Sequence, residues 1–91
     1  MNDTQPITPS QMRAGRALLD WSQEQLATTA GVSLSTVRDY EKERRGDIVV
    51  AGGLKAIREA LENQGVDFLP SQGDFGPGVR IHAKMPNVLR W

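Results

Sequence analysis

Three helix-start signals follow one another early in the chain, and they constrain its fold more than any other feature. Each signal is a serine or threonine that can cap a helix, namely Thr8, Ser22 and Ser33. The first two are followed three residues later by glutamine, which completes a capping box. Pro9 suits a first helical position, since its missing N–H would have no partner there. The pattern predicts three short helices, over residues 9–19, 23–30 and 33–42.

A fourth helix and a hairpin are predicted farther along the chain. Apolar residues recur at helical spacing from about Ala51 to Gln64, and Gly65 then offers a left-handed stop. Beyond it the pattern alternates with a period of two, in short runs on either side of the turn-rich segment 70–78. A two-stranded hairpin is marginal in water by itself, so we expect it to pack on the helices or to pair with another chain. The sequence therefore predicts a mainly α protein, a bundle of about four helices with a C-terminal β-hairpin.

The residue types present leave little room for catalytic or metal chemistry. The chain has 91 residues, enough for a single domain, with no cysteine and one histidine, His82. A zinc–thiolate site, a thiol nucleophile and a multi-histidine site are therefore excluded within one chain. The neighbours of His82 are apolar or basic, so we interpret it as a structural or solvent-facing side chain. We expect no enzyme, no metal and no cofactor; an enzyme would need chemistry built on His82 and an acidic residue.

Charge and hydropathy restrict the partners that the chain can have. No apolar run approaches the roughly 18 residues of a membrane span, and the first residues lack the basic start and apolar block of a signal peptide, so we expect a cytoplasmic protein. The formal net charge is 0, whereas nucleic-acid binding usually leaves a basic footprint. A basic cluster, Lys42, Arg44 and Arg45, nevertheless follows the third predicted helix. Any anion-binding surface must therefore be local.

The second and third predicted helices have the spacing of a helix-turn-helix. Ala30 lets the two helices approach, Gly31 permits the turn and Ser33 caps the second helix, although an ordinary helical hairpin has the same turn. At the level of residues, this part of the chain resembles the Cro and phage-repressor (XRE-type) family of bacterial helix-turn-helix regulators, over about residues 8–64. The resemblance rests on Arg16-Ala17-Leu18-Leu19-Asp20-Trp21-Ser22-Gln23-Glu24-Gln25-Leu26-Ala27, then Ala30-Gly31-Val32-Ser33, Thr36-Val37 and Tyr40-Glu41. The end of the chain is similar to small stand-alone members that finish in a β-hairpin.

This resemblance implies a lambda-repressor-like domain and a division of the chain into four segments. We expect a flexible tail at 1–7, a helix-turn-helix DNA-binding domain at 8–65, a β-hairpin at 66–84 that serves dimerisation, and a C-terminal tail at 85–91. The recognition helix, residues 33–42, would lie in the major groove of double-stranded DNA.

The outward residues of the recognition helix are expected to contact bases. They are Leu34, Ser35, Arg38 and Asp39. Arg38 can form two bonds with guanine, Asp39 can accept from a cytosine amino group, and Leu34 can cover a thymine methyl. The alternative is that the two charged residues are ordinary surface groups and that the leucine is incidental.

A second group of residues is expected to contact the DNA backbone. It comprises Gln23, Ser33, Thr36, Lys42, Arg44 and Arg45. Gln23 would stand at the N-terminal end of the second helix, where free N–H groups and the helix dipole favour an anion. The alternatives are that Gln23 only caps its helix and that the basic cluster is a solvated face.

Two further residues are assigned to the interior of the domain on the strength of the resemblance. In the family, the arginine that matches Arg16 and the glutamate that matches Glu41 pair with each other, so we expect a structural ion pair here. Trp21 is interpreted as core. The family often has glycine where this chain has Asp20, and because aspartate adopts the left-handed conformation less easily, that helix end is expected to differ.

A single recognition helix reads few base pairs, so we expect a homodimer on a palindromic operator. The expected dimerisation residues are apolar and lie in the hairpin and the tail, namely Val79, Ile81, Val88, Leu89 and Trp91. The predicted function is a sequence-specific DNA-binding transcriptional regulator, most simply a repressor. The alternative is an antitoxin or another protein-interaction module of the same fold, in which the hairpin and tail bind a second protein and DNA binding is secondary.

Overall fold

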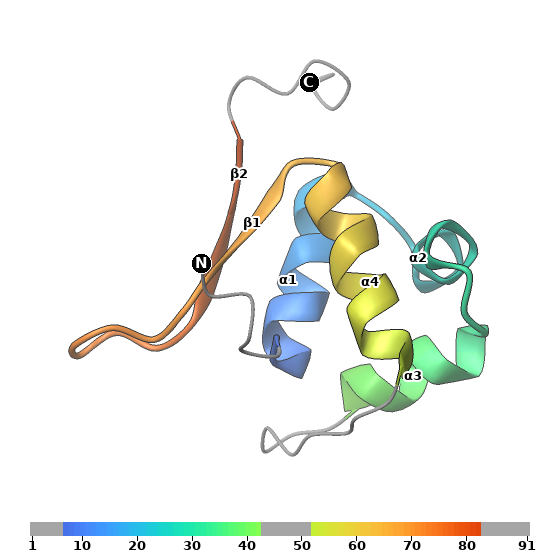
Figure 1. Ribbon diagram of the computed structural model, residues 1–91, viewed down its shortest axis with the longest axis horizontal. Coiled ribbons are helices and arrows are strands. Elements are labelled where there is room, and N and C mark those ends of the chain that lie inside the picture. Colours follow the sequence, from blue (N-terminus) through green and yellow to red (C-terminus); the bar gives the residue numbers. More distant parts are fainter. Residues whose placement is uncertain (1–6, 43–51, 83–91) are drawn as a thin grey trace.

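The computed structural model describes residues 7–42 and 52–82, which form four helices and two strands. In chain order they are α1 (Pro9–Leu19), α2 (Gln23–Ala30), α3 (Leu34–Lys42), α4 (Gly52–Asn63), β1 (Val66–Leu69) and β2 (Gly78–Ile81). The helices form a bundle, and the hairpin covers one side of it (Figure 1). The expected class, a mainly helical helix-turn-helix bundle with a C-terminal β-hairpin, is confirmed.

The predicted caps begin the first three helices. Thr8 and Gln11 form a complete capping box, in which the Thr8 hydroxyl accepts from the Gln11 N–H at 3.0 Å and the Gln11 side chain accepts from the Thr8 N–H at 2.9 Å. Ser22 accepts from the Gln25 N–H at 3.0 Å. Ser33 accepts from the N–H three residues on, at 3.1 Å. Each hydroxyl satisfies a backbone donor that the first turn of a helix leaves unpaired.

The end of α1 corrects one expectation. Asp20 adopts the left-handed conformation, with φ 61° and ψ 37°, and its N–H donates to the carbonyls of Ala17 and Arg16. Helix α1 therefore ends in the left-handed cap that a glycine would make, with aspartate bearing the cost of that conformation. Helix α2 ends in the same way at Gly31, where φ is 76°.

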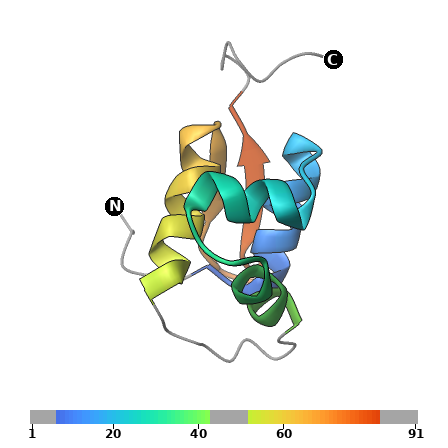
Figure 2. The same ribbon diagram turned by 90° about the vertical axis from the view of Figure 1, so that its right-hand side faces the viewer.

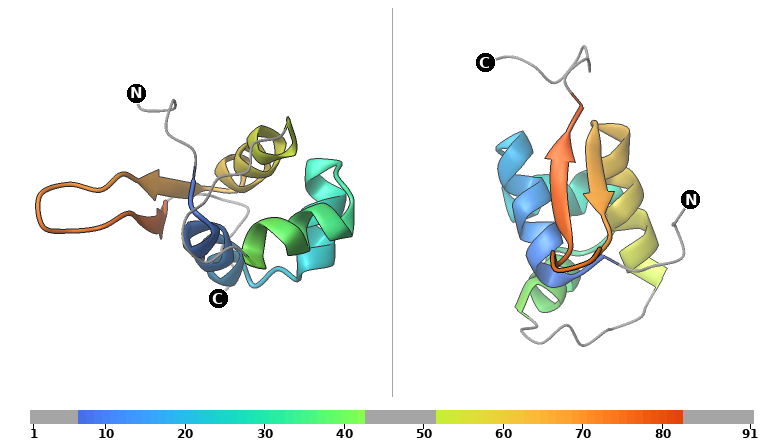
Figure 3. Two further views of the ribbon diagram at one scale, coloured as in Figure 1. Left: turned by 90° about the horizontal axis from the view of Figure 1, so that it is seen from below. Right: turned by 90° about the vertical axis from the view of Figure 1, so that its left-hand side faces the viewer.

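The strands form an antiparallel hairpin that lies across α1 and α4. β2 packs against α1, and β1 packs against α4 (Figure 3). The register pairs Val66 with Ile81 and Phe68 with Val79. Because side chains alternate along a strand, these four apolar residues share the face that lies on the helices. The second strand begins one residue earlier than predicted, at Gly78.

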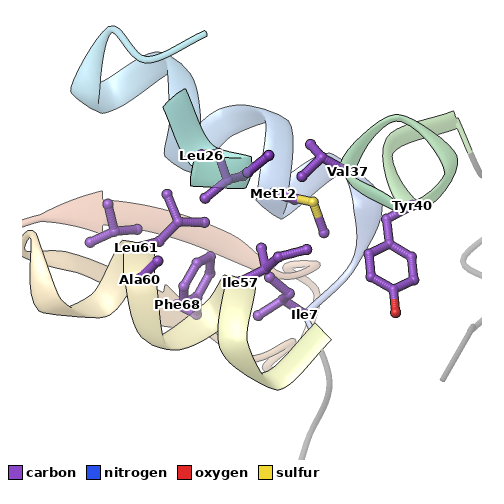
Figure 4. Packing of buried hydrophobic residues seen from close by; sticks show 11 residues of the cluster. Ile7, Met12, Leu26, Val37, Tyr40, Ile57, Ala60, Leu61 and Phe68 are labelled. Atoms are coloured by element: carbon purple, nitrogen blue, oxygen red, sulfur yellow. The ribbon is translucent and has the colours of Figure 1, made fainter. Parts of the chain in front are cut away.

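The core is built from all four helices and the hairpin (Figure 4). Its largest fully buried side chains are Met12, Leu26, Val37, Ile57 and Leu61. In α1, Gly15 is buried, whereas Ala17 is exposed. Val66, Leu61 and Phe68 surround the position that a Cβ of Gly15 would occupy, so the hairpin and α4 pack closely on α1 at this point.

Candidate nucleic-acid interface

Helices α2 and α3 pack against each other and are joined by a tight turn, residues 31–33. At Gly31 the backbone is left-handed, and the N–H groups of Gly31 and Val32 both donate to the Ala27 carbonyl, at 2.9 and 3.0 Å. Ser33 then opens α3. The two helices lie in front of α1 and α4, with α3 at one end of the bundle (Figure 2).

The face of α3 opposite the core presents a small polar surface. Ser35, Arg38 and Asp39 are exposed, while Val37 and Tyr40 are buried. This division matches the side-chain period of a helix, so the exposed three share one side of α3. That side of α3 therefore offers both hydrogen-bond donors and hydrogen-bond acceptors.

Leu34 differs from the expectation that it points outward. It is half-buried and packs against the core cluster, so fold stability accounts for part of this side chain. Its exposed remainder still lies in the first turn of α3, next to Ser35.

The hydroxyl groups at the start of α3 are joined to each other. Ser33 Oγ lies 2.8 Å from Thr36 Oγ1 and 3.4 Å from Ser35 Oγ. Thr36 is half-buried, and its methyl group lies near Gly53 of α4. The first turn of α3 thus presents an interlinked group of hydroxyls, with Ser33 and Ser35 exposed.

Glu41, in the last turn of α3, joins the first three helices. Its side chain is 4% exposed and accepts from Arg16 of α1 twice, Nε to Oε2 at 2.8 Å and a terminal nitrogen to Oε1 at 2.9 Å. The amide nitrogen of Gln23, the first residue of α2, donates to Oε1 at 3.1 Å. Arg16 also donates to the Trp21 carbonyl at 2.9 Å. The structure therefore brings Arg16 and Glu41 together and adds Gln23 to the pair.

This arrangement favours the charged form of Arg16. The hydrogen bond and the negative charge of Glu41 raise the pKa of Arg16, against a smaller opposing effect of burial. Arg16 is therefore held in its charged form, and the two parallel hydrogen bonds to Glu41 make the pair directional.

Arg13 of α1 is a contact that the sequence reasoning missed. Its guanidinium donates to the backbone carbonyl of Glu41 and, at 3.1 Å, to Ser10 Oγ. Carbonyls in the last turn of a helix lack helical partners, so a cation is favourable there. The available signal was the spacing of Arg13 and Arg16, which places both on one side of α1 facing α3.

The comparisons with known proteins agree with this geometry. A family profile described as helix-turn-helix matches residues 12–46, which contain α2, the turn and α3. Over residues 12–46 the chain is thus similar to the Cro/C1-type helix-turn-helix of the XRE family. Helix-turn-helices of this type are the DNA-binding elements of transcriptional regulators, so the match supports DNA binding by this chain. The search of curated proteins found no match for this chain.

Two absences accompany this helix-turn-helix. Within residues 7–42 and 52–82, no group of three or more histidine, cysteine or acidic side chains could hold a metal ion. Among the helices in the same ranges, none is long and apolar enough to cross a membrane.

Several expected contact residues lie outside the described part of the chain. They are Arg44 and Arg45 of the basic cluster and Val88, Leu89 and Trp91 of the tail. Lys42, the first residue of the cluster, is exposed at the end of α3, and its Nζ lies 3.7 Å from Asp39 Oδ1. Such an exposed pair contributes little to stability, so both side chains can exchange their partner for another one.

Two of the residues expected at a dimer interface, Val79 and Ile81, lie in the hairpin. Val79 packs partly against the core of its own chain, and Ile81 is half-buried on the same face of the hairpin. The Val79 side chain is thus partly used inside the domain. On the opposite face, Arg80 and Asp67 form an ion pair at 2.9 Å.

Proposed function

We propose that this protein is a dimeric repressor that binds a palindromic operator through α3 in the major groove. The observation that carries the proposal is the exposed polar face of α3, held beside the start of α2 in a helix-turn-helix. An α-helix fits the major groove, where each base pair presents a distinct pattern of donors and acceptors. Steric exclusion of polymerase from an occupied operator is the simplest mechanism for such a repressor.

Base recognition is assigned to Ser35, Arg38 and Asp39, with the exposed part of Leu34 against a thymine methyl. Arg38 has the strongest chemistry for it, because a guanidinium offers two parallel donors to the O6 and N7 atoms of guanine. Asp39 is an acceptor for a cytosine amino group, and its weak pairing with Lys42 leaves it free to engage one. The three exposed residues could thus read neighbouring base pairs.

The backbone contacts are assigned to residues at the two helix starts and at the end of α3. Gln23 stands at the first position of α2, and Ser33 and Thr36 lie at the start of α3, where helix dipoles favour phosphate. Lys42 supplies a cation, and we extend the proposal to Arg44 and Arg45. Contacts of this kind position the protein without reading sequence.

Dimerisation is assigned to the outer edge of β2. The His82 N–H donates to the Gly65 carbonyl at 2.9 Å, so in the alternating antiparallel ladder the N–H and C=O groups of Val79 and Ile81 point away from β1. A β2 strand from a second copy could pair with them around a two-fold axis at Arg80. The Arg80 charges would then face each other, each compensated by its own Asp67.

An amide-exchange experiment tests the dimer and has an internal control. In a β2–β2 dimer, the Val79 and Ile81 amides are protected at high protein concentration and exchange quickly when the protein is dilute. The His82 amide, which donates within the hairpin, stays protected in both. A protein that sediments as a monomer, or a dimer in which the Val79 and Ile81 amides exchange quickly, would contradict this interface. A truncation after Gly65 is unsuitable, because it removes Val66 and Phe68 from the core.

The DNA-binding test compares Arg38→Ala with Arg38→Lys. Both are titrated with duplexes from the DNA upstream of the chain's own coding sequence, with excess nonspecific DNA and at several salt concentrations. Selective, salt-sensitive binding is expected for the unaltered protein. Both variants should lose selectivity, because lysine keeps the charge but not the bidentate geometry. Full selectivity in Arg38→Lys would refute bidentate reading, and no selective binding to genomic DNA would refute the proposal.

One observation favours a second candidate function, a protein-interaction module such as an antitoxin. The hairpin loop extends away from the helices (Figure 1), and Phe75 in it is 78% exposed. Aromatic side chains are enriched at protein–protein interfaces, so Phe75 is suited to anchor such a contact. A protein that binds no DNA selectively, but forms a complex with the product of an adjacent gene that Phe75→Ser abolishes, would support this candidate.

A further inference from the structure

The side-chain amide of Gln23 is held in one orientation by Glu41. The two groups approach at 3.1 Å, nitrogen to Oε1. An ionised carboxylate only accepts hydrogen bonds, so it selects the nitrogen end of the amide and disfavours the oxygen end. Because that nitrogen carries two hydrogens and Glu41 takes one, a second donor remains at the start of α2.

We propose that Glu41 is a positioning residue for the contact of Gln23 with the DNA backbone, an assignment that rests on the proposed function. Glu41 lies on α3 and Gln23 on α2, so one hydrogen bond ties the phosphate-binding donor to the helix that reads bases. Arg16 holds the carboxylate from the other side with two bonds. The three side chains fix the donor in place before DNA arrives.

A fixed amide has an advantage for binding because it determines whether the partly positive N–H or the partly negative oxygen faces the phosphate. A glutamine amide free to rotate offers its acceptor oxygen as readily as its donor nitrogen, and the oxygen repels a phosphate. In the proposed arrangement, the bond to Glu41 fixes the amide with its second N–H toward the phosphate, so the cost of ordering the Gln23 side chain falls on folding instead of on binding. The negative charge of Glu41 does not offset this gain, because Arg16 neutralises it.

The first measurement needs no DNA. In the nitrogen–proton spectrum of the full chain, the side-chain amide of Gln23 is identified by its loss in Gln23→Ala. We expect one of its two protons downfield of the corresponding proton of Gln25, an exposed glutamine two residues later. The difference should disappear in Glu41→Gln. Equal shifts for Gln23 and Gln25 in the unaltered protein would overturn the proposal.

The second measurement is a double-mutant cycle on DNA affinity. Gln23→Ala is measured in three backgrounds: the unaltered chain, Glu41→Gln, and Glu41→Asp. The last keeps the charge beside Arg16 but withdraws the carboxylate by one methylene, so it serves where Glu41→Gln folds poorly. Gln25→Ala is the matched control for changes to the first turn of α2. Folding of every variant is checked by circular dichroism.

The cycle separates positioning from a structural role. We expect Gln23→Ala to weaken binding to an upstream duplex about tenfold in the unaltered chain and less than about twofold in either Glu41 background, because coupled residues are not additive. The salt slope should stay the same, since a neutral amide releases no counterion. An equal loss in all backgrounds overturns the proposal while the proposed function stands. No duplex binding by the unaltered protein overturns the proposed function, and the DNA role of this pair with it.

Discussion

The side-chain amide of Gln11 donates a hydrogen bond of 2.9 Å to the backbone carbonyl of Gly78, which lies 67 residues later in the chain. The same nitrogen donates to the Leu69 carbonyl at 3.1 Å, and the side-chain oxygen accepts from the Thr8 N–H. Leu69 and Gly78 are the paired residues at the loop end of the hairpin. One buried glutamine therefore joins the start of α1 to both strands and leaves none of its own hydrogen-bonding groups unused.

Gln11→Glu should destabilise the protein by about 2–4 kcal/mol, because the capping acceptor is kept but both donors to the hairpin are lost. A carboxylate would also face two carbonyl oxygens. The measurement is urea unfolding followed by circular dichroism, with Gln25→Glu as the control. That change, on an exposed position in the first turn of α2, should be neutral or slightly stabilising. A Gln11→Glu protein as stable as the unaltered one would mean that the hairpin does not depend on this side chain.

Gly15 and Gly31 should respond to alanine in opposite directions. At Gly15 a Cβ would meet Val66 at 3.4 Å and Leu61 at 3.5 Å, which is ordinary contact, so alanine should stabilise by about 0.5–1 kcal/mol through helix propensity. At Gly31 there is open space but φ is +76°, so alanine should destabilise by about 1 kcal/mol. Thermal unfolding of both variants would show whether the space around the new Cβ or the backbone conformation decides the effect of alanine. Loss of stability in Gly15→Ala would show that the hairpin sits closer to α1 than described.

The left-handed cap at Asp20 predicts a gain of stability on substitution. Asp20→Gly should stabilise the protein by about 0.5–1 kcal/mol, since glycine adopts a positive φ without steric cost. Asp20→Ala, the matched control, should destabilise it, because alanine has neither that freedom nor a polar side chain suited to the conformation. Melting temperatures in the order glycine, aspartate, alanine would support this account. Any order with alanine above aspartate would contradict it.

Local signals in the sequence predicted the helices and strands. Contacts between residues far apart in the chain could not be predicted from it. Caps such as Thr8 and Ser22 act on residues within one turn, so their chemistry is readable from spacing. The Gln11 contacts with the hairpin and the Arg13 contact with the Glu41 carbonyl depend on how elements pack, which no local pattern encodes.

The candidate interface shows the same division. The pairing of Arg16 with Glu41 was available only through the family resemblance, and the participation of Gln23 was not available at all. The outward position expected of Leu34 failed because a residue in the first turn of a helix can lean onto the adjoining core. Asp20 was expected to alter a helix end and instead accepts the strained conformation, since the bonds of its N–H to Ala17 and Arg16 hold it there.

The hydroxyl of Tyr40 is buried without a hydrogen bond of ordinary geometry among residues 7–42 and 52–82, and the Leu54 backbone only partly opposes the effect of burial, so this hydroxyl should make stability fall at alkaline pH. Burial raises the pKa of Tyr40 above its ordinary value of 10.0. The unfolded chain therefore ionises first, and the stability that depends on a neutral phenol is complete below about pH 10 and is lost as pH rises through the folded pKa.

Tyr40 is the only tyrosine of the chain, so its ionisation can be followed directly by ultraviolet absorbance. We expect the phenolate to appear above pH 10 and together with unfolding measured by circular dichroism. Tyr40→Phe should be as stable as the unaltered protein at neutral pH, or more so, because it removes an unpaired buried hydroxyl. It should also retain more of its stability at alkaline pH, where lysine deprotonation affects both proteins equally. A phenol that ionises at its ordinary pH without unfolding would show that water reaches the hydroxyl between α3 and α4.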